Sequence, residues 1–495
     1  MERTMPQASA SPDAPRRNGL SLVDVVAQSV GFMGPVFSVS ILLPLLVGMN
    51  AAGRGAGSAA PLAVLIATVG MLALGWIVSA YARRVKTAGS LYNYVTLGLG
   101  QRAGAAAGLM YYAGVLLLGA AIGPLVGGYL HDTLAAEFHV QPLPVWGWQL
   151  LILVGVVALV YVGVEFSVRS QLVLSLISVG VLLIFFIYVI VKVGGGNSAT
   201  AFSPDTAQDG WSGILFAVLY GVLLFTGFEA AANLAEEAKD PQRHIPKAVT
   251  FSVLAAAVFF LIGTYAQVAG FHFDLNVMAK ASGAPLNALA GGSPGGYGST
   301  SWGRLVELVV FLDMIAVYVG ISVSATRGVL TMARDGWLPR PLATVSIRRG
   351  SPTGGTVLVG MAYLAVIGIS HLFPRLLELP GAPSYLATYS WFSTFGIFCL
   401  AAIYLMMALG APRGLRDHPR RWLVWLCAAV GVMLTAGALF GSVYKVPSPT
   451  VYATYFALGW FVAATVIAVF VGRRRARDEP TRAMRERPSA SECRG

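Results

Sequence analysis

Two short stretches of the sequence could do chemistry, because each interrupts an apolar run that would otherwise form an unbroken membrane helix. The interrupting residues are Gly31, Gly34 and Pro35 in the first run, and Gly227 and Glu229 in the second. Glycine and proline weaken a continuous helix, and a carboxylate is unwelcome in hydrocarbon. We therefore expect the backbone to unwind at both places.

Unwinding a helix within a membrane exposes N–H and C=O groups, so the unwound segment must line a cavity that is closed by protein or filled by a polar ligand. The half-helix that begins after a break presents free N–H groups and the positive end of the helix dipole, which suit a carboxylate. The half-helix that ends at a break presents carbonyl groups, which suit an ammonium group. Two adjacent breaks could therefore hold both ends of a zwitterion such as an amino acid.

Glu229 follows the second break, and α-helical spacing predicts that Asn233, Glu236 and Glu237 share its face at i+4, i+7 and i+8. We expect this face to point into a cytoplasmic half-channel and to form part of a cytoplasmic gate. A carboxylate in that position could trade protons as the cavity opens to either side. Alternatively, Glu229 hydrogen-bonds the unwound backbone of the first span and holds the two breaks together. Both roles stay open.

Asp313 is the most central carboxylate of the run 304–333 and the second candidate for proton coupling. It could face a polar cavity on the outer side, or it could make a structural hydrogen bond. Ser322, Ser324 and Thr326 could supply oxygen ligands to a sodium ion, but hydroxyl groups within a helix more often bond their own backbone. A proton is therefore expected ahead of sodium as the coupling ion.

The composition is that of a membrane protein. Hydrophobic residues make up 56% of the 495 residues and charged residues 11%, against about 25% charged residues in soluble domains. A membrane helix needs about 20 mostly apolar residues, and about twelve such runs are present. They cover residues 21–49, 59–80, 101–130, 146–166, 170–192, 211–238, 246–270, 304–333, 353–373, 385–409, 421–443 and 449–472.

The distribution of basic residues predicts the orientation. If the N-terminus is cytoplasmic, 28 of the 34 Lys and Arg residues fall on the inner side, and six fall on outer connections: Arg54, Lys192, Lys280, Arg304, Arg375 and Lys445. The positive-inside rule then favours a multi-pass protein of the plasma membrane with both termini in the cytoplasm. The net charge of +12 follows from this orientation and the basic tail. We therefore expect contact with membrane lipid and no nucleic-acid partner.

The two interrupted spans lie five spans apart, which is typical of two inverted repeats that each begin with a discontinuous helix. The predicted fold is an all-α polytopic membrane protein of the five-plus-five inverted-repeat type, with discontinuous helices 1 and 6 and two extra C-terminal helices. The expected divisions are a disordered cytoplasmic tail at 1–20, repeats at 21–193 and 211–409, the extra helices at 421–472 and a basic cytoplasmic tail at 473–495.

Other functional classes find little support. The six histidines are scattered over helix ends and loops, and no HExxH pattern is present. We therefore expect no catalytic residues, no metal site and no cofactor. A membrane-embedded sensor on the same scaffold is a distant alternative, although no soluble signalling domain is visible in the sequence.

Several longer motifs resemble those of a known family. They are FTGFEAAANLAEEAKDPQRHIPKAV, ATRGVLTMARDGWLPRPLATV followed by SPTGG, and TAGSLYNYVTLGLG. Together they resemble the amino acid–polyamine–organocation superfamily of permeases, and the resemblance covers residues 21–472. It implies a transporter fold that holds its substrate between spans one and six.

The resemblance also implies roles for individual residues. It implies that the break with Gly31, Met33, Gly34, Pro35 and Val36 binds the substrate carboxylate. It implies that the carbonyls of Phe225, Thr226 and Gly227 bind the amine and that Phe228 forms a gate over the substrate. The cytoplasmic end of span eight would be ordered by Arg327, Arg334 and Asp335. Two departures leave questions open. Pro35 removes one N–H donor from the first break, and Ser178 stands where proton-driven relatives can carry a lysine.

We expect a secondary transporter of amino acids or related amines that works by alternating access, with proton symport as the leading mechanism. The alternative within this class is an exchanger that swaps one amino acid, polyamine or other amine for another without an ion. The sequence does not specify the substrate side chain or the oligomeric state.

Overall fold

The computed structural model describes residues 20–48, 55–85, 90–162, 167–235, 238–281, 285–292, 295–346, 351–379, 382–446 and 448–485. The regular structure within these ranges is helical. The single extended contact among them is a bridge in which Leu20 lies parallel to Ala238. The predicted all-α architecture is therefore observed.

Twelve segments of the described chain are long and apolar enough to cross a membrane, as predicted. In order, the spans contain α1 and α2 (Leu22–Met33 and Pro35–Ile41), α4 (Ala60–Ala82), α6 (Gln101–Phe138), α7 (Val145–Val162), α8 (Ser167–Val193), α9 with η5 (Gly210–Leu224 and Phe228–Leu234), α10 (Pro241–Gly270), α13 (Thr300–Arg334), α14 (Thr353–Leu372), α15 (Ser384–Gly414), α16 (Arg421–Gly441) and α17 (Thr450–Arg485). The shorter helices are α3 (Leu43–Val47), α5 (Ser90–Leu99), α11 (Leu275–Lys280) and α12 (Pro285–Ala290).

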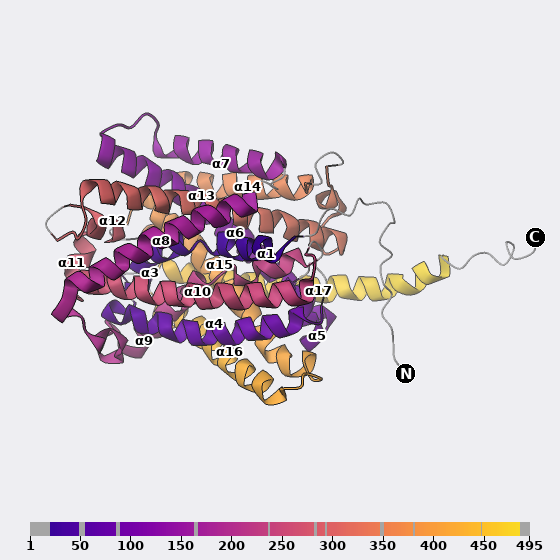
Figure 1. The fold of residues 1–495 in the computed structure, drawn as a ribbon. Coiled ribbons are helices and arrows are strands. Elements are labelled where there is room, and N and C mark those ends of the chain that lie inside the picture. Colours follow the sequence, from indigo (N-terminus) through magenta and orange to yellow (C-terminus); the bar gives the residue numbers. More distant parts are fainter. Residues whose placement is uncertain are drawn as a thin grey trace, which may run out of the picture.

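The long helices run side by side along one direction (Figure 1). The short helices α11 and α12 lie at one end of this bundle, and α5 lies at the other end together with the C-terminal part of α17. Short 3-10 turns occur in several connections: η1 (Gly57–Ala59), η2 (Gly194–Gly196), η3 (Ala199–Phe202), η4 (Pro204–Thr206), η6 (Arg340–Ala343) and η7 (Pro374–Leu376).

Burial separates the inner spans from the outer ones. In the apolar stretch of the sixth span 94% is buried, whereas in the apolar stretch of α17 only 22% is buried. The third span, formed by α6, is also deeply buried and packs most extensively against α15. The two interrupted spans therefore lie within the protein, where neighbouring helices can supply partners to an unwound backbone.

The two interrupted spans are also joined at one end. Leu20, just before α1, forms the bridge with Ala238, just after η5. The N–H of Lys239 donates to the Leu20 carbonyl at 3.1 Å. The start of the first span and the end of the sixth are thereby held together through backbone atoms.

Small residues allow α6 and α15 to approach closely. A Cβ atom added to Gly114 would lie 3.0 Å from the Gly396 carbonyl oxygen, and one added to Gly396 would lie 2.5 Å from Leu118 Cγ. Facing glycines of this kind let two membrane helices meet backbone to backbone. The contact between α6 and α15 therefore depends on these two positions.

We predict that Gly396→Leu destabilises the protein, because the added side chain overlaps Leu118 and separates α15 from α6. The expected loss is at least about 1 kcal/mol, measured as a lower midpoint of thermal unfolding in detergent. The matched control is Gly155→Leu on α7, where an added Cβ would meet nothing within 4 Å. An equal loss in both variants would contradict this account of the packing.

Candidate functional site

The first break lies at Gly34, between α1 and α2. Gly34 has a φ of 52°, and its N–H closes α1 by donating to the Val30 carbonyl. A Cβ atom at this position would lie 1.9 Å from Val317 Cγ2 on α13, so only glycine fits. Pro35 then begins α2, where its missing N–H costs no helical hydrogen bond.

The second break runs from Phe225 to Gly227, between α9 and η5. Gly227 has a φ of 107°, and a Cβ atom there would lie 2.2 Å from Phe32 Cδ1 and 3.0 Å from the Met33 nitrogen. The second break is therefore in direct contact with the last residues of α1. The sequence predicted both interruptions, and the structure brings them together.

The segment after the second break corrects one prediction. It forms a 3-10 helix from Phe228 to Leu234, with about three residues per turn instead of 3.6. The predicted α-helical spacing of this segment, on which the shared face was based, is therefore wrong. Glu236 and Glu237 lie outside the described residues.

Glu229 is fully buried at the second break. Its Oε2 accepts a hydrogen bond from the Gly227 N–H at 3.1 Å, and its Oε1 accepts one from the Tyr111 hydroxyl at 3.2 Å. The carboxyl group thus supports the unwound backbone of its own span and links it to α6. These contacts differ from the bond to the first span that the structural alternative assumed.

Ser29 on α1 makes the connection between the two interrupted spans. Its hydroxyl donates to the Phe228 carbonyl at 3.0 Å and accepts from the Ala231 N–H at 3.2 Å. Both bonds are buried, and both reach η5. Ser29 therefore fixes α1 against the segment that follows the second break.

Asp313 on α13 is buried beside the first break. Its Oδ2 accepts a hydrogen bond from the Phe37 N–H at 2.8 Å. Phe37 is the third residue of α2, and Gly34 provides no side-chain cap for this helix. Asp313 thus caps the start of α2 from another span. In most helices the residue just before the first turn supplies this acceptor.

A small cavity of about 30 Å³ lies where the two breaks meet. It is lined from span one by Phe32, Met33, Phe37, Ser38 and Leu42, from span six by Leu223 and Thr226, and from α6, α13 and α15 by Leu118, Ile122, Val317, Ile321 and Tyr389. This volume holds on the order of one or two water molecules. The walls must therefore separate before a molecule as large as an amino acid can enter.

Only some of the predicted substrate residues reach this cavity with their side chains. Met33 and Thr226 line it. Phe225 packs edge-on against Phe260 of α10, with ring centroids 5.2 Å apart, and Phe228 packs 5.8 Å from the ring of Tyr404 on α15. Gly34, Pro35, Val36 and Gly227 lie at the breaks, whereas Gly31 lies within α1, which continues to Met33.

Several residues at the site had no signal in the sequence. Tyr389 lines the cavity, and its ring lies 5.8 Å from that of Phe37 at 77°. Tyr111 reaches Glu229 from α6, and Ser29 is one serine among many. Their roles arise from contacts between residues far apart in the chain, which spacing along one helix does not reveal.

The residues predicted for the cytoplasmic end of span eight lie at or near the end of α13. Gly336, with a φ of 70°, donates to the Ala333 carbonyl, and the Trp337 N–H donates to the Met332 carbonyl. This pair of bonds is a Schellman motif, which ends a helix with a left-handed glycine. Arg334 is exposed, Asp335 is the C-cap and Arg327 lies two turns earlier.

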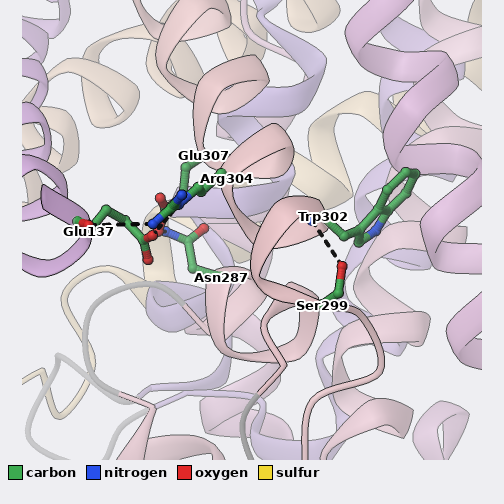
Figure 2. A network of polar contacts seen from close by, with 6 residues as sticks. All are labelled: Glu137, Asn287, Ser299, Trp302, Arg304 and Glu307. Atoms are coloured by element: carbon green, nitrogen blue, oxygen red, sulfur yellow. Dashed lines mark hydrogen bonds and ion pairs between the residues drawn. The ribbon is translucent and has the colours of Figure 1, made fainter.

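A second polar network lies at the opposite end of α13 (Figure 2). Arg304 pairs with Glu137 of α6 at 2.7 Å, and the Asn287 amide of α12 donates to Glu307 at 3.3 Å and to Tyr129 at 3.2 Å. This network joins α6, α12 and α13. The described residues contain no group of three His, Cys, Asp or Glu side chains that could hold a metal ion.

We predict that Ser29→Ala destabilises the junction between the two breaks. The substitution removes two buried hydrogen bonds between α1 and η5, whose own 3-10 bonding still pairs the Ala231 N–H with the Phe228 carbonyl. The expected cost is about 0.5–1.5 kcal/mol per bond. The control is Ser40→Ala, because Ser40 is also buried but donates only within α2, to Val36. Thermal unfolding in detergent should separate the two variants, and equal midpoints would contradict the role of Ser29.

Comparisons with known proteins agree with this architecture. The family model described as amino acid permease matches residues 20–471. The chain is 28% identical to the branched-chain amino acid permease BcaP of Lactococcus lactis subsp. cremoris over 393 residues, which cover 74% of this chain and 79% of that protein. It is 27% identical over 474 residues to an uncharacterized transporter of Mycobacterium tuberculosis, with 94% of each chain covered.

Two further matches extend the comparison. Cationic amino acid transporter 4 of Mus musculus is 28% identical, covering 74% of this chain and 58% of that protein. A crystal structure of a manganese transporter from Eremococcus coleocola aligns with a TM-score of 0.52 at 12% identity, covering 92% of this chain and 94% of that chain, which shows a common fold. The predicted superfamily and fold class are therefore confirmed. This multi-pass membrane protein belongs to the amino acid permease family, whose members are transporters and not enzymes.

Proposed function

We propose that this permease carries an amino acid or a related amine by alternating access, with the substrate held at the two breaks and transport coupled to proton entry. The observation that carries the proposal is the contact of Gly227 with Phe32 and Met33, beside a cavity that both spans line. Two breaks in contact give one ligand access to unwound backbone from two helices at once.

The second break offers acceptors for an ammonium group. In the described part of the chain, no backbone N–H is paired with the carbonyl of Leu224 or Thr226. Thr226 also lines the cavity. An amine bound here would satisfy carbonyl groups that the helix has left unpaired, which is a favourable exchange within a membrane.

Opening of the cavity requires one group of helices to move against another. The spans formed by α1 with α2, by α4, by α9 with η5 and by α10 pack against one another, and they correspond to spans one, two, six and seven. We propose that this group rocks against the remaining helices, which include α6 and α13. Gates then close on each side of the substrate in turn.

Glu229 is the proposed proton carrier. It is fully buried at the break, and no basic side chain is paired with it in the described residues. A carboxylate in such a place changes its charge by exchanging a proton when water reaches it. The competing proposal is an ion-independent exchanger, and the bonds from Gly227 and Tyr111 favour it because they give the carboxyl group a structural task.

We predict that Glu229→Gln abolishes pH-driven accumulation of substrate but retains exchange of substrate across the membrane. Glutamine keeps an oxygen that can accept from Gly227, but it cannot carry a proton. The measurement is uptake of a labelled panel of amino acids and amines into proteoliposomes, first under a pH gradient, then under a sodium gradient, and then with substrate preloaded inside. Accumulation should fall at least about tenfold, or 1.4 kcal/mol.

The control is Glu137→Gln at the far end of α6, which removes a carboxylate outside the site. This variant should accumulate substrate as the unaltered protein does. Loss of both accumulation and exchange in Glu229→Gln, with poor folding, would assign Glu229 to structure alone. Uptake by the unaltered protein only after preloading would establish the exchanger instead.

We also predict the orientation in the plasma membrane, with both termini in the cytoplasm. Ala199→Cys in η3 and Asp417→Cys between α15 and α16 are to be placed separately in a protein from which Cys399, Cys427 and Cys493 have been removed. Both positions are exposed, and they lie on opposite sides if an odd number of spans separates them. A membrane-impermeant maleimide should label Ala199→Cys in intact cells and Asp417→Cys only after permeabilisation; the reverse pattern would invert the topology.

A further inference from the structure

Asp313 is a buried charge-bearing group beside the substrate cavity. The residue is 2% exposed, and its Oδ2 accepts from the Phe37 N–H at 2.8 Å. The N–H of Val36 interacts with the same carboxyl group. No basic side chain is paired with Asp313 in the part of the chain that the structure describes.

The N–H groups that Asp313 meets are the ones that the first break has available. Pro35 has no N–H, and the Ser38 N–H donates to the Gly34 carbonyl at 2.8 Å. This leaves Val36 and Phe37 as the donors at the start of α2, and both interact with Asp313. A carboxylate brought in by a substrate would therefore have to displace the protein's own carboxylate.

The cavity next to Asp313 is apolar. Val317, one turn further along α13, lines it, and so does Phe37, whose N–H Asp313 binds. No charged side chain is among the lining residues. The cavity therefore suits a hydrocarbon group, and it offers no second acid for the far end of a diamine.

We propose that Asp313 stands in for the carboxylate of an amino acid, and that the substrate is an apolar monoamine without a carboxyl group of its own. This inference rests on the proposed function, because it assigns the substrate class of the same cavity. The ammonium group binds the carbonyls of Leu224 and Thr226, and the hydrocarbon part occupies the lining formed by α6, α13 and α15.

Charge balance supports this assignment. A cationic monoamine neutralises the carboxylate of Asp313 when the cavity closes. A zwitterionic amino acid adds no net charge, and its carboxylate comes to lie beside that of Asp313. Like charges repel strongly where water is excluded, so the zwitterion is the poorer ligand.

The test compares amino acids with the amines that lack only the carboxyl group. The pairs are L-leucine with 3-methylbutylamine, L-phenylalanine with 2-phenylethylamine, and L-lysine with 1,5-diaminopentane. Equilibrium binding to the full chain in lipid nanodiscs avoids the passive leak of amines through liposomes. For the first two pairs the unaltered protein should bind the amine at least about tenfold more tightly than the amino acid, and the diamine should bind weakly.

Two variants test whether Asp313 sets this preference. Asp313→Asn keeps an oxygen that can accept from the Phe37 N–H, and it should weaken binding of the two monoamines at least about tenfold. Asp313→Gly leaves the donors of Val36 and Phe37 unoccupied, and it should raise the affinity for L-leucine relative to 3-methylbutylamine. The control is Glu307→Gln on the same helix, which should leave the ratio unchanged.

The affinity for each amine relative to its amino acid is measured in the unaltered protein. Misfolding of a variant therefore cannot affect this part of the test. Tighter binding of L-leucine and L-phenylalanine than of their amines would overturn the inference and leave the proposed function intact. An unchanged ratio in a folded Asp313→Asn variant would do the same. Binding of none of the six compounds would overturn the inference together with the proposed function.

Discussion

The structure depends on one constraint: backbone groups that a break exposes inside a membrane must be satisfied by protein, because hydrocarbon offers no hydrogen bonds. Each break is supported by side chains from elsewhere in the fold. Ser29 of α1 bonds backbone atoms of η5, Tyr111 of α6 holds Glu229 against the Gly227 N–H, and Asp313 of α13 holds the start of α2. These supports fix the distance between the breaks and therefore the size of the cavity.

The helix α13 links this support to the rest of the molecule. It carries Asp313 against α2, it crosses over Gly34 at Val317, and it contributes Val317 and Ile321 to the cavity wall. One end of the helix is closed by a glycine cap at Gly336, and the other is tied to α6 and α12 by the network in Figure 2. A helix tied to α6 and α12 at its start and to α2 at Asp313 is suited to position a wall against which other helices move.

The sequence was informative where the signal is local. Apolar runs predicted the twelve spans, and glycine and proline predicted both breaks, because these residues act through their own backbone. The prediction of an α-helix after the second break was wrong, since a 3-10 helix and an α-helix differ by a fraction of a residue per turn and the sequence does not separate them. The partners of Glu229 and Asp313 could not be predicted, because they come from spans that lie far away in the chain.

The parallel bridge between Leu20 and Ala238 has a mechanical consequence. It joins the start of the first span to the end of the sixth, while Ser29 joins the same two spans near the breaks. Two attachments along their length prevent these spans from sliding or twisting against each other. They therefore move together as one unit. A passage at this end of the molecule then opens between this unit and the neighbouring helices rather than between the two spans.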